Sequence, residues 1–180
     1  MRVITGKARG VQLKTPEGML TRPTADRVKE ALFSIINFDL PGAAVLDLFG
    51  GTGQLGIEAL SRGANSAVFV DQREDACKII RENLRRTKLE SQSKVVRSDY
   101  LDYLRRSREK FDIILLDPPY AEVFLENALK CITEIDILKS DGIIVAERPV
   151  EKELPFEFEG FTRSKDYKYG KTLLTIYRKD

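Results

Sequence analysis

Short apolar runs alternate with amphipathic stretches between residues 43 and 146. The runs are rich in Val, Ile and Leu, as buried strands are, and span 43–49, 66–70, 94–97, 111–116 and 142–146. The stretches between them repeat apolar residues at helical spacing and span 54–62, 73–88, 99–109 and 121–137. Strands that alternate with helices form βαβ units. The pattern therefore predicts an α/β fold in which helices cover both faces of a parallel sheet.

The two ends of the chain follow different patterns. Residues 2–15 alternate loosely around two glycines, which predicts an N-terminal hairpin, and Thr24 is a candidate N-cap for the helix that follows. Near the C-terminus, Gly170 separates two further strand patterns, 161–168 and 171–178, and so predicts a second hairpin. We therefore expect a mostly parallel sheet that finishes in an antiparallel hairpin.

Composition excludes several kinds of chemistry. The 180 residues include 30 Lys and Arg, 28 Asp and Glu, two Cys and no His, and the net charge is +2. This length is typical of one domain. Without histidine, Ser-His-Asp and Cys-His nucleophile systems and histidine-ligated zinc are impossible, and two cysteines are too few for a thiolate cage, so we expect no metal. No run approaches the roughly 20 apolar residues of a membrane span and no signal-peptide pattern is present, which favours a cytoplasmic protein.

A glycine-rich loop follows the first apolar run. Gly51, Gly53 and Gly56 have the spacing GxGxxG, and Asp71 lies at the end of the next predicted strand. In dinucleotide-binding folds this combination holds the pyrophosphate and the ribose. An oxidoreductase or nucleotide-binding module that uses NAD is therefore one interpretation.

Asp47 favours a different ligand. Its carboxylate ends the first strand, where it would face the pyrophosphate that a helix N-terminus attracts. An anion at this position suits S-adenosylmethionine, which has an ammonium and a sulfonium group and no phosphate. Asp71 would then accept hydrogen bonds from the ribose hydroxyls. Asp99, after the third strand, is either an acceptor for the adenine amino group or only the N-cap of the next helix, and the two roles are compatible.

The sequence Asp117-Pro118-Pro119-Tyr120 follows the fourth apolar run, where open α/β sheets bind ligands. Two prolines stiffen the backbone and remove two N–H donors. The Asp117 carboxylate and the Pro118 carbonyl are each suited to accept one N–H of an exocyclic amine, which turns the nitrogen lone pair toward a methyl donor. Tyr120 supplies a stacking face for a base that has been turned out of its helix. The motif predicts transfer of a methyl group to an amine by direct displacement.

These residues resemble the class I S-adenosylmethionine-dependent methyltransferases with an (Asp/Asn)-Pro-Pro-aromatic motif, and specifically the RsmD family. The resemblance covers nearly the whole chain, in segments 2–10 (RVITGKARG), 22–33 (RPTADRVKEALF), 47–64 and 169–172. Members methylate the exocyclic N2 of a guanine in bacterial 16S ribosomal RNA. The family usually has a small residue such as Ala where Gly51 stands and often Glu where Asp71 stands. Neither difference removes a required glycine or carboxylate.

The resemblance implies a fold, a cofactor and a partner. The fold is a Rossmann-like seven-stranded class I methyltransferase sheet at residues 23–180, preceded by an N-terminal β-hairpin extension at residues 1–22 that contacts RNA. The cofactor is S-adenosyl-L-methionine, the product is S-adenosyl-L-homocysteine, and the partner is 16S rRNA of the small ribosomal subunit. We expect a monomer.

The resemblance also implies roles for individual residues. The catalytic residues are Asp117, Pro118 and Tyr120. The cofactor-binding residues are Asp47, Phe49, Gly51, Gly53, Asp71 and Asp99. Arg22 and Thr24 would bind substrate at the mouth of the active site.

Positive charge gathers at both ends of the chain. Residues 1–29 contain seven Lys and Arg against two acidic residues, and residues 161–180 contain six against two. The basic residues of the N-terminal hairpin, Arg2, Lys7 and Arg9, are therefore candidates for contacts with RNA phosphates. A purely solubilising arm is the alternative.

Two other functions remain open. An amino-methyltransferase with the same motif acts on adenine N6 of DNA or RNA, or on a protein glutamine. The basic N-terminal arm favours nucleic acid over glutamine, and only the family signature favours guanine over adenine. The more remote function is that of an NAD-binding oxidoreductase or nucleotide-binding module.

Overall fold

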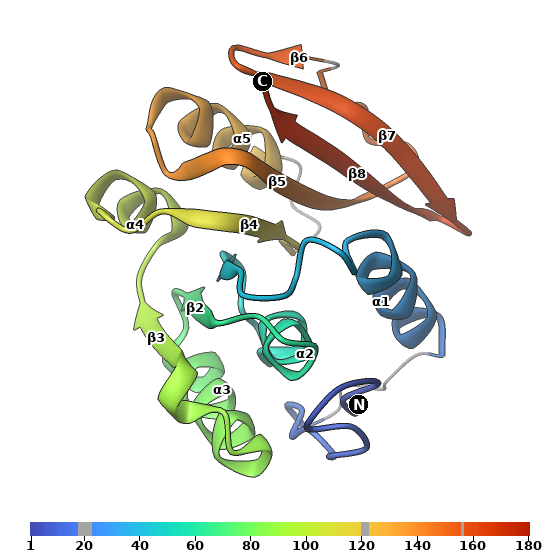
Figure 1. Cartoon of the computed structure of the whole chain (residues 1–180), viewed down its shortest axis with the longest axis vertical. Coiled ribbons are helices and arrows are strands. Elements are labelled where there is room, and N and C mark those ends of the chain that lie inside the picture. Colours follow the sequence, from blue (N-terminus) through green and yellow to red (C-terminus); the bar gives the residue numbers. More distant parts are fainter. Residues whose placement is uncertain (18–22, 120–122, 156) are drawn as a thin grey trace.

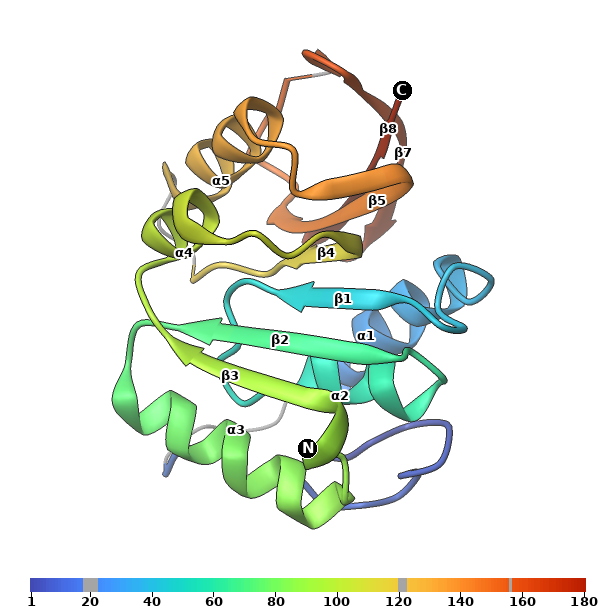
Figure 2. The same cartoon turned by 60° about the vertical axis from the view of Figure 1, so that its left-hand side comes forward.

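The computed structural model describes residues 1–17, 23–119, 123–155 and 157–180. Within these ranges one sheet has the strand order β3-β2-β1-β4-β5-β8-β7-β6 (Figures 1 and 2). Its strands are β1 (Ala44–Asp47), β2 (Ser66–Asp71), β3 (Ser93–Arg97), β4 (Phe111–Leu116), β5 (Leu138–Pro149), β6 (Glu157–Phe158), β7 (Phe161–Tyr169) and β8 (Thr172–Lys179). The helices are α1 (Pro23–Ile35), α2 (Gln54–Ser61), α3 (Glu74–Thr87), α4 (Tyr100–Arg106) and α5 (Val123–Glu134), with a short 3-10 turn at Glu90–Gln92. None of the helices in the described ranges has the length and apolar character needed to cross a membrane.

The first five strands are parallel, and the last three are antiparallel. β1 pairs with β2 and β4, β2 with β3, and β4 with β5, all in parallel. β8 then pairs antiparallel with β5, and β7 with β8. Gly170, in the turn between β7 and β8, has a φ of 60°, which glycine adopts without steric cost. The predicted mostly parallel seven-stranded sheet with a C-terminal hairpin is confirmed, and two-residue β6 adds an eighth strand at its edge.

Strand β5 extends beyond the apolar run 142–146 at both ends. Its first residue, Leu138, still pairs with β4, and its last residue, Pro149, pairs with Thr172 of β8. Hydrogen bonding to two neighbours, rather than apolar character, therefore sets the length of this strand. The extension brings Glu147 into β5.

Helix α1 begins at Pro23, one residue before the predicted cap. Thr24 therefore lies in the first turn of the helix and not at the N-cap. Proline is favoured at the first helical position, because its φ is already helical and its missing N–H has no partner there in any case.

The core consists of two apolar clusters, one on each face of the sheet. The first cluster contains buried residues of α1, α2 and α3, and the second contains those of α4 and α5. Successive residues of one strand alternate between them, as Val45 in the first cluster and Leu46 in the second illustrate. A residue's position along a strand thus decides which face its side chain reaches.

The N-terminal segment, residues 1–17, folds back on itself against the first cluster. It contributes three buried residues to that cluster, namely Val3, Ala8 and Leu13. The predicted pair of strands is reduced to one β-bridge, between Arg2 and Gln12. The backbone N–H groups of Ile4 and Thr5 donate instead to the Glu58 carboxylate, at 2.9 and 3.0 Å. Because those donors are already bonded to α2, the segment cannot extend its own ladder.

Glu58 is fully buried and is the centre of an ion cluster beneath this segment. It pairs with Arg62 at 2.9 Å and with Lys29 at 3.6 Å. Lys29 Nζ also donates to the carbonyl of Arg2 at 2.7 Å. The cluster therefore joins α1, α2 and the N-terminal segment.

Candidate active site

Acidic residues lie at the carboxyl ends of four adjacent parallel strands. They are Asp71 on β2, Asp47 on β1, Asp117 just after β4 and Glu147 on β5. Because Leu116 pairs with Ala146, Asp117 and Glu147 follow at the same level of neighbouring strands. Leu115 and Val145, two residues earlier, belong to the first cluster, and alternation puts the two carboxylates on that face as well. This edge of the sheet is where open α/β folds bind ligands.

The loop between β1 and α2 is held against two of these carboxylates. The Gly56 N–H donates to Oδ2 of Asp47 and the Gly51 N–H to Oδ2 of Asp71, each at 3.0 Å. Gly51 and Gly53 have φ values of 57° and 80°, in the left-handed region that glycine tolerates. The glycines thus let the loop turn tightly enough for its N–H groups to reach both carboxylates.

A cavity of about 530 Å³ opens beside this loop, and we call it the loop cavity. Its acidic lining residues are Asp47, Asp71 and Asp117. Three aromatic rings that pack together also line it: Phe49 and Tyr100, with centroids 5.1 Å apart, and Phe124, 5.5 Å from Tyr100. Such a cavity has an apolar wall for a planar base and carboxylates for polar or cationic groups.

Burial makes the carboxyl groups of Asp47, Asp117 and Glu147 hard to ionise. Asp47 is 1% exposed, and its removal from water raises its pKa to about 8; the charges of Asp117 and Asp71 add to the rise and the Gly56 N–H opposes it. Burial also raises the pKa of Asp117, and burial together with the charge of Asp117 raises the pKa of Glu147. A ligand with positive charge or N–H donors would relieve this cost, whereas a phosphate group would add to it.

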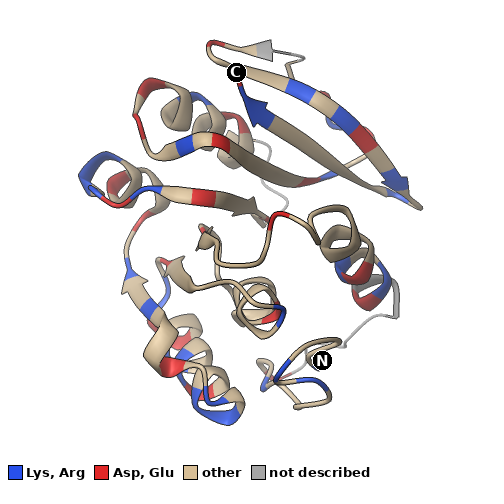
Figure 3. Ribbon diagram, viewed as in Figure 1, with Lys and Arg blue, Asp and Glu red and all other residues tan. Residues whose placement is uncertain are grey.

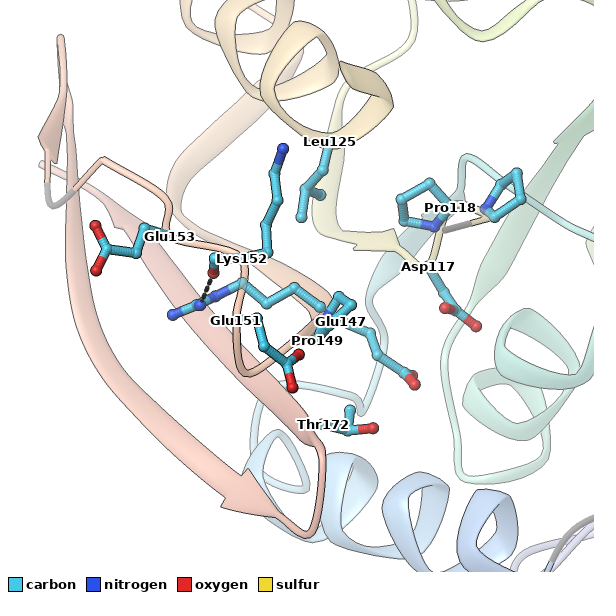
Figure 4. Close-up of a pocket in the computed structure, with 11 residues that line it drawn as sticks. Asp117, Pro118, Leu125, Glu147, Pro149, Glu151, Lys152, Glu153 and Thr172 are labelled. Atoms are coloured by element: carbon cyan, nitrogen blue, oxygen red, sulfur yellow. Dashed lines mark hydrogen bonds between the residues drawn. The ribbon is translucent and has the colours of Figure 1, made fainter. Parts of the chain in front are cut away.

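A second cavity, of about 440 Å³, lies at the end of β5, and we call it the β5 cavity. Asp117 and Glu147 line it, together with the segment that follows β5 (Figure 4). Asp117 and Pro119 line both cavities. The Asp-Pro-Pro motif therefore separates two spaces, each large enough for a small molecule or a base.

Other predicted residues lie in several different places. Asp99 caps α4: its Oδ1 accepts the N–H groups of Leu101 at 2.9 Å and Asp102 at 3.2 Å. The N-cap alternative for Asp99 is thus confirmed, and its contact with a cofactor stays a prediction. Arg22 and Tyr120 lie outside the described residues, and so does the side chain of Thr24.

The basic residues of the N-terminal segment are spread along its length. Met1 lines the loop cavity, so its neighbour Arg2 lies close to the site. Lys7 donates through Nζ to Gln92, which precedes β3 and therefore lies at the opposite edge of the sheet. Figure 3 shows Lys and Arg on this segment and along β7.

The prediction from sequence missed three residues that line the cavities. Glu147 follows the apolar run 142–146 directly, as Asp117 follows 111–116, so the same signal was present. Tyr100 and Phe124 belong to different helices, and only the packing of α4 and α5 brings them to Phe49. Among the described residues, no group of three or more Cys, Asp or Glu has an arrangement that would hold a metal ion.

Comparison with known proteins assigns the chain to a family. It matches the family described as "Conserved hypothetical protein 95" over residues 1–178. The "Putative rRNA methyltransferase YlbH" of Bacillus subtilis is 41% identical over 99% of both chains. The "Ribosomal RNA small subunit methyltransferase D" of Haemophilus influenzae is 34% identical over 86% of this chain and 81% of its own, and that of Escherichia coli K12 is 29% identical over 100% and 90%.

Solved structures agree with the sequence matches. The "Putative methyltransferase yhhF from Escherichia coli" covers 100% of this chain and 98% of its own, with a TM-score of 0.90 and 28% identity. A hypothetical protein of Thermus thermophilus covers 98% of each chain, with a TM-score of 0.83 and 31% identity. These matches extend over nearly the whole chain, and this chain therefore belongs to the RsmD family of class I S-adenosylmethionine-dependent methyltransferases.

Proposed function

We propose that this protein transfers a methyl group from S-adenosylmethionine to the exocyclic N2 amine of a guanine in 16S ribosomal RNA. The observation that supports the proposal most strongly is the position of Asp117 and Pro119, which line both cavities. A group transfer needs two molecules to meet at one point, and the motif occupies such a point. The relatives named as ribosomal RNA small subunit methyltransferases support the choice of RNA.

The loop cavity fits S-adenosylmethionine. Bound there, the cofactor supplies an electrophilic methyl group on a sulfonium. Asp47 is a buried carboxylate with a raised pKa, so a cationic group beside it is favourable and a pyrophosphate is not. Asp71 and Phe49 line the same cavity, and we expect Asp71 to accept hydrogen bonds from the ribose hydroxyls and the Phe49 ring to pack against the adenine.

Asp117 and Pro118 orient the amine that is methylated. One N–H donates to the Asp117 carboxylate and the other to the Pro118 carbonyl, so the lone pair of N2 faces the loop cavity. Transfer forms an N–C bond while the C–S bond breaks and leaves its electron pair on sulfur, after which N2 loses a proton. Burial raises the pKa of Asp117, which makes its carboxylate a stronger acceptor for this N–H and for the proton. No side-chain nucleophile is needed.

Basic residues near the β5 cavity offer contacts for an RNA backbone. Lys168 and Lys171 lie at the exposed tip of the β7–β8 hairpin, next to Thr172, which lines that cavity. Arg2 directly follows Met1, which lines the loop cavity. Lysine and arginine in such positions bind phosphates without reading sequence and position the base for the site.

Transfer of a labelled methyl group to small ribosomal subunits that lack the modification tests the proposal. We expect label in RNA, and mass spectrometry should identify N2-methylguanosine. Asp117→Ala should abolish transfer while S-adenosylmethionine affinity, measured by calorimetry, stays within a few fold. Asp141→Asn, an exposed change on β5, is the control and should retain transfer.

Three results would contradict the proposal. Label in N6-methyladenosine or in protein would assign a different acceptor. Tight binding of NAD without binding of S-adenosylmethionine would assign a different reaction. Retention of most of the rate by Asp117→Ala would remove the orienting role of that carboxylate.

A further inference from the structure

Glu147 is a half-buried carboxylate that lacks a compensating partner. Within the described part of the chain it forms no hydrogen bond or ion pair, and its side chain extends into the β5 cavity (Figure 4). The next residue, Arg148, does not neutralise it. Arg148 lies on the other face of the strand, where it bonds to Thr175 at 2.8 Å and to Asp166 at 2.9 Å. A carboxylate without such a partner costs stability and is suited to bind a ligand.

Glu147 stands beside Asp117 at the point where the acceptor amine must lie. Asp117 directly follows β4 and Glu147 lies on β5 at the same level, and neighbouring strands are about 4.8 Å apart. In Figure 4 both carboxylates point into the same space. Two acceptors side by side match a ligand edge that carries two neighbouring N–H donors.

We infer that Glu147 is the residue that selects guanine, by accepting its N1–H while Asp117 accepts an N–H of the adjacent N2 amine. This inference rests on the proposed function and names the group that recognises the base. Guanine presents N1–H and the N2 amine next to each other on one edge. Adenine presents an unprotonated N1 beside its N6 amine, so its lone pair would face the Glu147 carboxylate. The same pair of carboxylates would therefore accept guanine and reject adenine.

The surroundings of Glu147 make its protonation responsive to the ligand. The charged and titratable residues that line the β5 cavity with Glu147 are Asp117, Arg148, Glu151, Lys152 and Glu153. Arg148 is bonded to Asp166, and Lys152 pairs with Glu126 at 3.1 Å, so these cations have partners of their own. Burial and the charge of Asp117 raise the pKa of Glu147 in the free protein. An N–H donor bound to the carboxylate lowers that pKa again, so guanine binding should release a proton, and kcat/KM should rise as the pH rises through this titration.

The test compares two bases at the methylated position. The small-subunit RNA is prepared with guanine or with 2-aminopurine there; 2-aminopurine keeps the amine at C2 but has an unprotonated N1. At a pH above 8, where Glu147 is ionised and can only accept, we expect kcat/KM of the wild-type protein to be about 10- to 100-fold lower on 2-aminopurine, as for one wrong base contact. Glu147→Gln offers both an amide oxygen and an amide N–H, so it can bond to either base. The kcat/KM values of this variant on guanine and on 2-aminopurine should therefore agree to within a few fold. Glu153→Gln makes the same change on the same wall, where the side chain points away from Glu147 in Figure 4, and should keep the wild-type ratio.

The outcomes separate this inference from the proposed function. If wild-type protein methylates no guanine in the small-subunit RNA, the proposed function fails. If it does, but Glu147→Gln keeps the wild-type ratio between the two bases and the wild-type pH profile, Glu147 does not select the base. Unchanged S-adenosylmethionine affinity of Glu147→Gln shows that the variant is folded. A loss of activity in equal proportion on both bases would indicate a merely structural role and would overturn the inference.

Discussion

Asp47→Asn should make the protein without cofactor more stable, and the gain should grow as the pH rises. Asp47 is 1% exposed, and burial raises its pKa from 3.8 to about 8. A carboxyl group whose pKa is higher in the folded than in the unfolded chain lowers stability at every pH at which that group is ionised in the unfolded chain. The cost is therefore absent below about pH 4, grows as the pH rises, and is complete above pH 8.

The magnitude follows from the two pKa values. Each pKa unit corresponds to about 1.4 kcal/mol, so ionisation of Asp47 costs about 2 kcal/mol at pH 5 and about 5 kcal/mol at pH 8. Asparagine has no charge to bury and keeps an oxygen that can accept the Gly56 N–H. The difference in unfolding free energy between variant and wild type should therefore increase by about 3–4 kcal/mol from pH 5 to pH 8. For a chain of this length that corresponds to an increase of about 10 °C in the difference in Tm.

Urea denaturation followed by circular dichroism at several pH values, without cofactor, measures this difference. Asp141→Asn is the control, because it makes the same chemical change at an exposed position and should follow wild type at every pH. Calorimetry of the same Asp47→Asn sample should show weakened binding of S-adenosylmethionine. If the difference in unfolding free energy between Asp47→Asn and wild type stays constant from pH 5 to pH 8, burial does not raise the pKa of Asp47 as stated.

Three further changes test the packing and the charge of the structure. Gly56→Ala should lower the free energy of unfolding by about 1–3 kcal/mol, because the alanine Cβ would lie 2.3 Å from Cε1 of buried Phe69. We expect this loss although alanine normally favours a helix, and an unchanged Tm would contradict the packing. Glu58→Gln should lower the free energy of unfolding by about 3–5 kcal/mol, since it removes the counter-charge of buried Lys29. Tryptic cleavage in the N-terminal segment should then be faster, and equal cleavage rates would contradict the anchoring role of Glu58. Lys7→Ala with Arg9→Ala should flatten the salt dependence of RNA binding by about one unit of slope for every phosphate that the variant no longer neutralises, whereas an unchanged slope would place the RNA elsewhere.

The order of strands and helices is largely predictable from the sequence because it depends on local periodicity. The apolar run 111–116 coincides with β4, and the other buried runs coincide with strands to within a few residues. The prediction fails where distant partners decide the outcome. β5 is longer than its apolar run because β4 and β8 both pair with it. The N-terminal segment forms a single bridge because Glu58 of α2 takes the N–H groups that a ladder would need.

The candidate site was predictable in part for a similar reason. Parallel strands end at one edge of a sheet, so Asp47 and Asp117 could be expected near each other although 70 positions separate them. Glu147 gives the same signal, but its neighbour in space is known only from the pairing of β4 with β5. The contact between Tyr100 and Phe124, at 5.5 Å and nearly perpendicular, depends on how α4 and α5 pack.

By itself, the sequence determined the fold class and the position of the glycine loop, and it predicts the chemistry of the Asp-Pro-Pro motif, since these depend on residue type and on spacing along one chain segment. It also determined that no histidine takes part in the reaction. The tertiary structure decided that Asp117 lies between two cavities, that Glu147 joins it, and that the basic residues of the N-terminal segment reach from the loop cavity to the opposite edge of the sheet. These features depend on register, on packing and on burial, which are properties of contacts between segments that lie far apart in the chain.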